Sequence, residues 1–92
     1  MMAQPVSYKC KIHIENIEKD SEIDGKYHFK GKIISTEEAA HNNSFYDQNL
    51  HISGFTFDDG ENLKEGTVIK ANVSFLGDPF KQNYQLDNIE IV

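Results

Sequence analysis

The fold follows from one stretch near the start of the chain, in which apolar and polar residues alternate strictly: Val6-Ser7-Tyr8-Lys9-Cys10-Lys11-Ile12-His13-Ile14. Side chains of an extended strand point to opposite faces in turn, so this alternation predicts a strand with one dry face. The serine, the two lysines and the histidine would lie on the outer face. The other residues would face a core.

Four more segments carry the same period of two. They span residues 26–33, 50–57, 67–76 and 84–92, and they are separated by polar connections and turns. In two of them the apolar positions change phase, at Gly54 and at Asp87-Asn88, which predicts a bulge or a sharp bend at each place. The first of these bends would turn Phe55 and Phe57 into the core.

These five segments predict an all-β domain with little or no helix, built as a small five-stranded barrel that is closed or partly open. Closure would remove the exposed edges that a lone five-stranded sheet must protect. We expect an OB-like barrel; an SH3-like barrel is the alternative, because it uses the same five strands with different crossings. At 92 residues the chain is one domain, residues 1–92, with residues 1–5 as a disordered or extended tail.

The cysteine count and the start of the chain bear on its location. A single cysteine, Cys10, allows no internal disulfide and favours a reducing compartment. Residues 1–5 contain neither a basic patch nor an apolar run, and no apolar stretch approaches the length that crosses a bilayer. We therefore expect a cytoplasmic protein with no membrane partner.

Several short motifs in the C-terminal half concern turns and the strands beside them: Ile52-Ser53-Gly54-Phe55, Leu63-Lys64-Glu65-Gly66 leading into residues 67–73, Gly77-Asp78-Pro79, and Asn88-Ile89. Together they resemble the last three strands of cold-shock-type OB domains. The resemblance implies an OB barrel. That family stacks bases on two aromatic-rich strands, whereas Gly31-Lys32-Ile33-Ile34 stands here where the first of them is expected. No binding residue is therefore carried over from the family.

Charge is unevenly distributed along this acidic chain, whose net charge is −6. Residues 1–32 hold six lysines and five acidic residues, and residues 33–92 hold three lysines and ten acidic residues. Pairing the first two strands as a hairpin would place a set of basic residues on one outward face: Lys9, Lys11, His13, Lys26, His28, Lys30 and Lys32. This face could dock an anionic partner, since clustered charge steers association. The alternative is that outward lysines only keep the sheet from aggregating.

Two aromatic pairs stand out as candidate contact residues: Phe45 and Tyr46 in one irregular stretch, and Phe80 and Tyr84 in another. Aromatic side chains outside the strand alternation are common interface anchors. They could equally fold back and plug the open ends of the barrel.

Catalytic and metal-binding patterns are lacking in the sequence. No nucleophile, base and orienting group can be named together, so we expect no enzyme activity and no cofactor. His13 and His28 could face each other near Glu15, but no regular ligand spacing supports a metal site there. Ser53-Gly54-Phe55-Thr56-Phe57 echoes an RNA-binding strand motif, yet the strand order that this motif needs is not predicted.

The hypothesis that these features favour is a small non-catalytic adaptor or inhibitor that binds another protein. The alternative is an OB-type domain that binds single-stranded nucleic acid on the lysine-rich hairpin. The chain contains no arginine and no tryptophan, which weighs against nucleic acid. A third possibility is an assembly subunit, and the sequence leaves the oligomeric state open.

Overall fold

The computed structural model describes residues 7–58, 60–77 and 80–92. The predicted tail at residues 1–5 lies outside these residues. So do Val6 of the first predicted strand, Asp59 of the connection after residue 57, and Asp78-Pro79 of the Gly77-Asp78-Pro79 motif.

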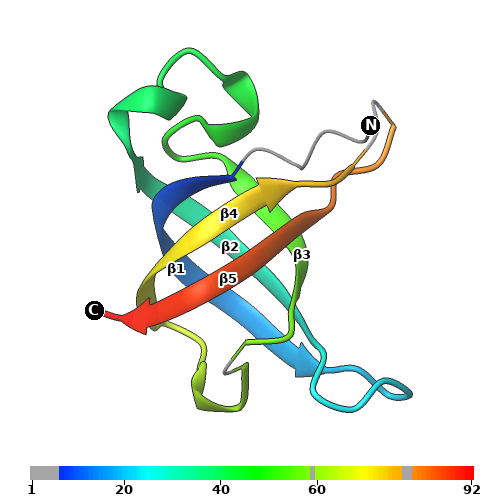
Figure 1. The fold of residues 1–92 in the computed structure, drawn as a ribbon. Coiled ribbons are helices and arrows are strands. Elements are labelled where there is room, and N and C mark those ends of the chain that lie inside the picture. The colour runs from blue at the N-terminus through cyan, green and yellow to red at the C-terminus, as the bar shows by residue number, and fades with distance from the viewer. Residues whose placement is uncertain (1–6, 59, 78–79) are drawn as a thin grey trace.

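In these described ranges the chain forms five strands, with three single turns of 3-10 helix between them (Figure 1). The strands are β1 (Ser7–Lys19), β2 (Tyr27–Thr36), β3 (His51–Thr56), β4 (Val68–Phe75) and β5 (Tyr84–Ile91). The helical turns are η1 (Glu38–Ala40) and η2 (Ser44–Tyr46) between β2 and β3, and η3 (Gly60–Asn62) between β3 and β4.

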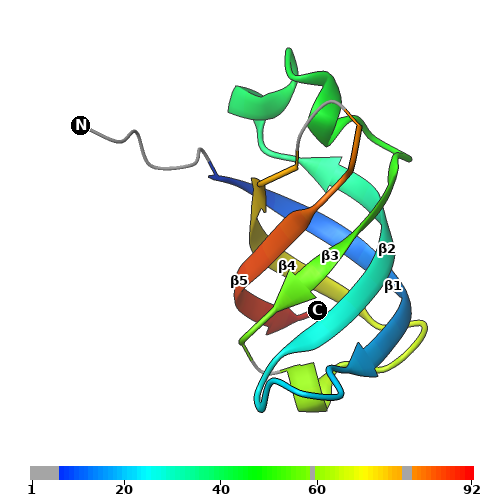
Figure 2. The ribbon, with the colours of Figure 1, turned by 90° about the vertical axis from the view of Figure 1, so that its right-hand side faces the viewer.

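The strands close into a barrel in the order β1-β2-β3-β5-β4, and β4 pairs with β1 to complete the ring. Every neighbouring pair is antiparallel except β3 and β5, which run parallel and lie side by side in Figure 2. The prediction of an all-β, five-stranded barrel is confirmed. The observed order is the OB-like one of the two arrangements considered.

The core consists of the inward residues of all five strands together with residues from the connections. The buried hydrophobic residues are Cys10, Ile12, Ile14, Phe29, Ile33, Ala40, Tyr46, Ile52, Leu63, Ile69, Ala71, Val73, Tyr84 and Leu86. Within the described part of the chain, Thr56 is the one polar residue in this interior, and its hydroxyl donates to the backbone carbonyl of Leu86 at 2.9 Å. A buried hydroxyl with a partner avoids the cost of an unsatisfied polar group.

The first strand is longer than its alternation predicts. The alternation ends at Ile14, but β1 continues to Lys19, which pairs with Tyr27. A register shift between Ile14 and Asn16 leaves Glu15 as an extra residue in β1. Such a bulge resets the inside–outside phase, which is why the strict alternation stops at residue 14 while the pairing continues.

The prediction for β3 is wrong in its second half. No change of phase occurs at Gly54: Ile52 and Thr56 are buried, whereas Phe55 is partly exposed and Phe57 is 55% exposed. Position 54 lies in the inward phase with Ile52 and Thr56, and it requires glycine because a Cβ there would overlap the backbone of Tyr84 in the adjacent strand. The two phenylalanines therefore face outward.

The bend predicted in β5 is present. The register between β4 and β5 shifts opposite Lys70 and Asn72, and Asn88 adopts a positive φ of 51°. Ile89 packs against the core after the shift, but Ile91 is 55% exposed.

Across the described ranges, no helix is long and apolar enough to cross a membrane.

Candidate functional site

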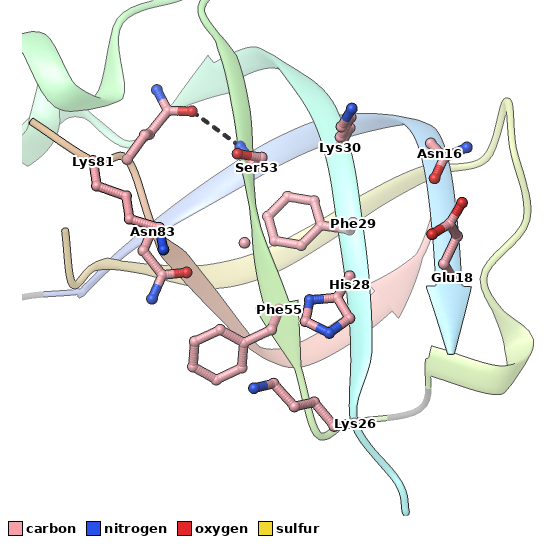
Figure 3. Close-up of a pocket in the computed structure, with 12 residues that line it drawn as sticks. Asn16, Glu18, Lys26, His28, Phe29, Lys30, Ser53, Phe55, Lys81 and Asn83 are labelled. Atoms are coloured by element: carbon pink, nitrogen blue, oxygen red, sulfur yellow. Dashed lines mark hydrogen bonds between the residues drawn. The ribbon is translucent and has the colours of Figure 1, made fainter. Parts of the chain in front are cut away.

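A groove of about 560 Å³ runs over the outer face of β2 and β3 (Figure 3). The end of β1 and the segment that precedes β5 form its two sides. Its lining residues are Asn16, Glu18, Lys26, His28, Phe29, Lys30, Ser53, Gly54, Phe55, Lys81, Gln82 and Asn83. Residues far apart in the sequence thus meet in one concave surface, because β2 and β3 are neighbours and the chain returns beside β3 at residue 82.

The groove is cationic although the protein is acidic. Lys26, Lys30 and Lys81 line it, and among the lining residues that the structure describes Glu18 is the single carboxylate. Lys26 directly precedes β2 and Lys30 lies within it; both line the groove together with His28, which stands between them at the alternate position. A concave surface that gathers charge of one sign attracts ions of the opposite sign.

Phe55 provides an aromatic ring among these charged side chains. Its ring lies beside His28 in Figure 3, and Lys26 reaches toward it, with Nζ 4.9 Å from the ring centroid. The ring of Phe57 meets Phe55 edge-on at a centroid distance of 5.7 Å. Phe55 is held at the surface by the pleat of β3, because the neighbouring positions 54 and 56 are the inward ones.

The side chain of Gln82 is bonded to the edge of β3. Its Oε1 accepts from the backbone N–H of Ser53 at 3.1 Å, shown by the dashed line in Figure 3. Its Nε2 donates to the backbone carbonyl of His51 at 3.4 Å. One amide group therefore satisfies a donor and an acceptor of the same strand.

Asp20 anchors the loop at one end of the groove. Its Oδ1 accepts from the backbone N–H groups of Glu22 and Ile23 at 2.8 and 2.7 Å, and its Oδ2 accepts from His28 Nε2 at 2.7 Å. The bond from the Ile23 N–H, then those from His28 and the Glu22 N–H, hold the pKa of this carboxyl well below its usual range. Asp20 thereby fixes the orientation of the His28 ring.

The structure brings together three of the seven basic residues predicted on the hairpin, Lys26, His28 and Lys30. Lys9 and Lys11 instead pair with β4, where Lys11 lies opposite Lys70. The curvature of a closed barrel divides a face that a flat hairpin would keep continuous.

The two remaining basic residues of the predicted set are His13 and Lys32. His13 pairs with Lys32, and Lys32 pairs in turn with His51 on β3. His51 contacts the Glu15 carboxylate at 2.9 Å.

His13 and His28 do not face each other as predicted, because the register places His28 opposite Glu18. Over residues 7–58, 60–77 and 80–92, no group of three histidine, cysteine, aspartate or glutamate side chains is placed to hold a metal ion.

The four aromatic contact candidates divide into two kinds. Tyr46 and Tyr84 are buried at 2% and 0% exposure and close one end of the barrel. The Tyr84 hydroxyl donates to the backbone carbonyl of Phe45 at 2.5 Å, and the Phe75 N–H donates to the Tyr46 hydroxyl at 2.9 Å. Burial raises the pKa of Tyr84 to about 12, as expected for an interior phenol.

The other two are at the surface. Phe45 is 48% exposed and stacks on Phe75 with a centroid distance of 4.2 Å, so it covers the end of the barrel and remains accessible. The side chain of Phe80 is 97% exposed.

Cys10 is buried in the core, as predicted. Burial raises the pKa of its thiol to about 12, and the nearby carboxylate of Glu37 adds to the shift. A thiol in this environment is a poor nucleophile.

Of the twelve lining residues the sequence predicts only Lys26, His28 and Lys30; the unpredicted ones that matter most for the chemistry of the groove are Phe55, Lys81 and Gln82. Phe55 had been assigned to the core because apolar residues usually point inward. The available signal was that the small residues Gly54 and Thr56 continue the inward phase of Ile52. Lys81 and Gln82 carry no local signal, because only the parallel pairing of β3 with β5 places them beside the groove.

No family model matches this chain, and no curated protein matches it. The function is therefore argued from the geometry of the groove.

Proposed function

We propose that this protein is a small, non-catalytic OB-type module that binds single-stranded nucleic acid along the β2–β3 face. The observation that carries the proposal is the position of Phe55, an outward aromatic ring in a groove lined by Lys26, Lys30 and Lys81. Proteins that bind single strands combine a positive groove that follows the phosphates with aromatic rings on which bases stack. The β2–β3 surface and the β4–β5 loop are also where OB barrels hold oligonucleotides.

The net charge of −6 does not prevent local binding of an anion. Screening at physiological salt limits the range of charge interactions to about 8 Å, so the groove lysines dominate the field that a bound strand experiences. The acidic surface elsewhere would weaken the affinity and restrict binding to this one face. We therefore expect modest affinity with a marked dependence on salt.

The resemblance to cold-shock-type OB domains is consistent with this function, with one change. The aromatic ring lies on β3, whereas β2 carries Gly31-Lys32-Ile33-Ile34 where that family has the first of its aromatic-rich strands. We also propose a location in a reducing compartment such as the cytoplasm, with which the single cysteine agrees.

Fluorescence anisotropy with a labelled single-stranded oligonucleotide tests the proposal. With two to three lysines on the phosphates, the plot of log K against log salt should have a slope of about −2. Lys30→Glu should weaken binding at least tenfold and make the slope shallower by about one unit. Lys64→Glu makes the same charge change at an exposed residue outside the groove and serves as the control.

Two results would refute the proposal. One is the absence of binding to any single-stranded oligonucleotide at low salt. The other is an equal loss of affinity for Lys30→Glu and Lys64→Glu, because a general charge effect would not require the groove.

A second candidate function is the protein-binding adaptor or inhibitor. The observation that favours it is a group of exposed apolar side chains at one end of the barrel: Phe45 at 48%, Leu76 at 38% and Phe80 at 97% exposure. The segment with η1 and η2 and the described residues of the β4–β5 connection lie at that end of the barrel in Figure 2. An exposed aromatic next to other apolar residues is typical of an interface anchor.

This candidate predicts that a protein recovered from cells with the wild-type chain is lost with Phe80→Ala. Phe57→Ala is the matched control, since Phe57 is also exposed but directly follows the C-terminal end of β3, away from that end of the barrel. Equal recovery with both variants would exclude Phe80 as an anchor.

A further inference from the structure

The edge of β3 that faces β5 is paired with that strand over only part of its length. β5 pairs with β3 only from Gly54 to Thr56, opposite Tyr84 to Leu86. Upstream of Gly54 the same edge carries the N–H of Ser53 and the carbonyl of His51. The side-chain amide of Gln82 bonds to both.

The amide of Gln82 has a chemical equivalent in nucleic acid. Its O=C–N–H group presents an acceptor and a donor separated by one carbon atom. The Watson–Crick edge of thymine carries the same O=C–N–H group at O4 and N3, and that of guanine carries it at O6 and N1. Bases in unpaired strands are read on this edge by hydrogen bonds.

Phosphate and carboxylate groups lack this complementarity. Either could accept from the Ser53 N–H, but neither has a donor for the carbonyl of His51. The lost bond would leave that carbonyl facing a negative charge. The donor–acceptor pair on β3 therefore selects for a base edge rather than for the backbone of the strand.

The surroundings place a base here next to the stacking surface. Ser53 and Phe55 project from the same face of β3, two residues apart, and Lys30 pairs with Ser53 across β2 and β3. One base on the ring of Phe55 and the next on the edge of β3 would leave the intervening phosphate near Lys30.

We propose that Gln82 is a placeholder for a nucleobase, and that a base of a bound single strand displaces its amide from Ser53 and His51. This inference rests on the proposed function and adds a specificity element to the same groove. A base pair occupies the edge that Gln82 mimics, so only an unpaired strand can replace it. Displacement is inexpensive, because Gln82 is exposed and one of its two bonds, to the carbonyl of His51, is long at 3.4 Å.

Nuclear magnetic resonance on ¹⁵N-labelled protein tests the displacement. Titration with a thymidine decamer should move the side-chain NH₂ resonances of Gln82 to the positions of a solvent-exposed amide, while the Ser53 N–H keeps a hydrogen-bonded shift. A decamer of abasic sites, which retains the phosphates, should perturb Lys30 and leave the Gln82 resonances in place. A duplex of the same length should also leave them in place.

Affinity measurements provide the second test. Gln82→Ala removes the competing amide and should bind the thymidine decamer about threefold to tenfold more tightly. Gln48→Ala, at an exposed glutamine outside the groove, should bind like the wild type. Unchanged or weaker binding by Gln82→Ala would overturn the placeholder role.

The outcomes distinguish this inference from the function on which it rests. If the thymidine decamer perturbs no groove resonance, the proposed function fails and the inference fails with it. If it perturbs Lys30 and Phe55 but not Gln82, or if the abasic decamer displaces Gln82 equally well, the placeholder role alone is refuted. Displacement by an extended peptide but not by the decamer would also refute it and would assign this edge to strand addition.

Discussion

Gly54 and Tyr84 meet where the parallel pair of β3 and β5 begins, and the backbone of Tyr84 occupies the space that a side chain at position 54 would need. This close approach has two consequences. It allows β5 to pair with β3 and close the barrel, and it assigns the inward phase of β3 to residues 52, 54 and 56. Phe55 is thereby directed to the outer face, into the groove.

Gly54→Ala should destabilise the protein by ~3 kcal/mol or more, because the overlapping atoms belong to the backbone and cannot rotate away. Urea unfolding followed by circular dichroism measures the change. Gly66→Ala is the control: it has a positive φ of 87° but no atom in the way of a Cβ. It should cost only about 1–2 kcal/mol. Equal costs for the two variants would contradict the steric account.

Phe55→Ala should lower the affinity for a single-stranded oligonucleotide about fivefold to 100-fold, since stacking is worth about 1–3 kcal/mol per base. The salt dependence should stay the same, because no charge is removed. Phe57→Ala changes an exposed phenylalanine directly after β3 that does not line the groove, and it should change the affinity less than about threefold. Equal effects of the two variants in anisotropy titrations would argue against stacking on Phe55.

Asp20→Asn should make the protein less stable near neutral pH but not in strong acid. Hydrogen bonds lower the pKa of this carboxyl in the folded state, so its charge contributes stability that is fully present above its ordinary pKa of 3.8. That contribution is lost as the pH falls through the lower folded value. Asparagine keeps an acceptor for the loop N–H groups but carries no charge.

The measurement is the melting temperature of the wild type and of Asp20→Asn between about pH 7 and pH 2. The difference between the two proteins should shrink below about pH 4. A difference that stays constant over this range would show that the charge of Asp20 contributes nothing.

Cys10 should not react with a thiol reagent in the native protein at pH 8. It is 2% exposed, and with a pKa of about 12 only about 10⁻⁴ of the thiol is ionised at that pH. Reaction should become rapid and complete in denaturant. A cysteine introduced at the exposed Ser44 is the positive control and should react within the mixing time. Stoichiometric labelling of native Cys10 would mean that β1 opens readily.

The sequence alone was sufficient for the class of fold and for most of the core. Strict alternation in the stretch that ends at Ile14, and again around Ile69, Ala71 and Val73, reports which side chains leave water, and five such segments in a chain of this length favour a barrel. The bend near Asn88 was also predictable, because a change of phase within one strand requires an irregular backbone.

The tertiary structure alone decided the order of the strands, the phase of β3 and the groove. Hydrophobic periodicity is a property of one strand at a time, so it contains no information on which strands are neighbours. The inward position of Gly54 depends on the backbone of Tyr84, which is 30 residues away in the sequence. Lys30 comes near Phe55 through the pairing of β2 with β3, and Gln82 comes near both through the parallel pairing of β3 with β5. Local patterns of polarity cannot encode either contact.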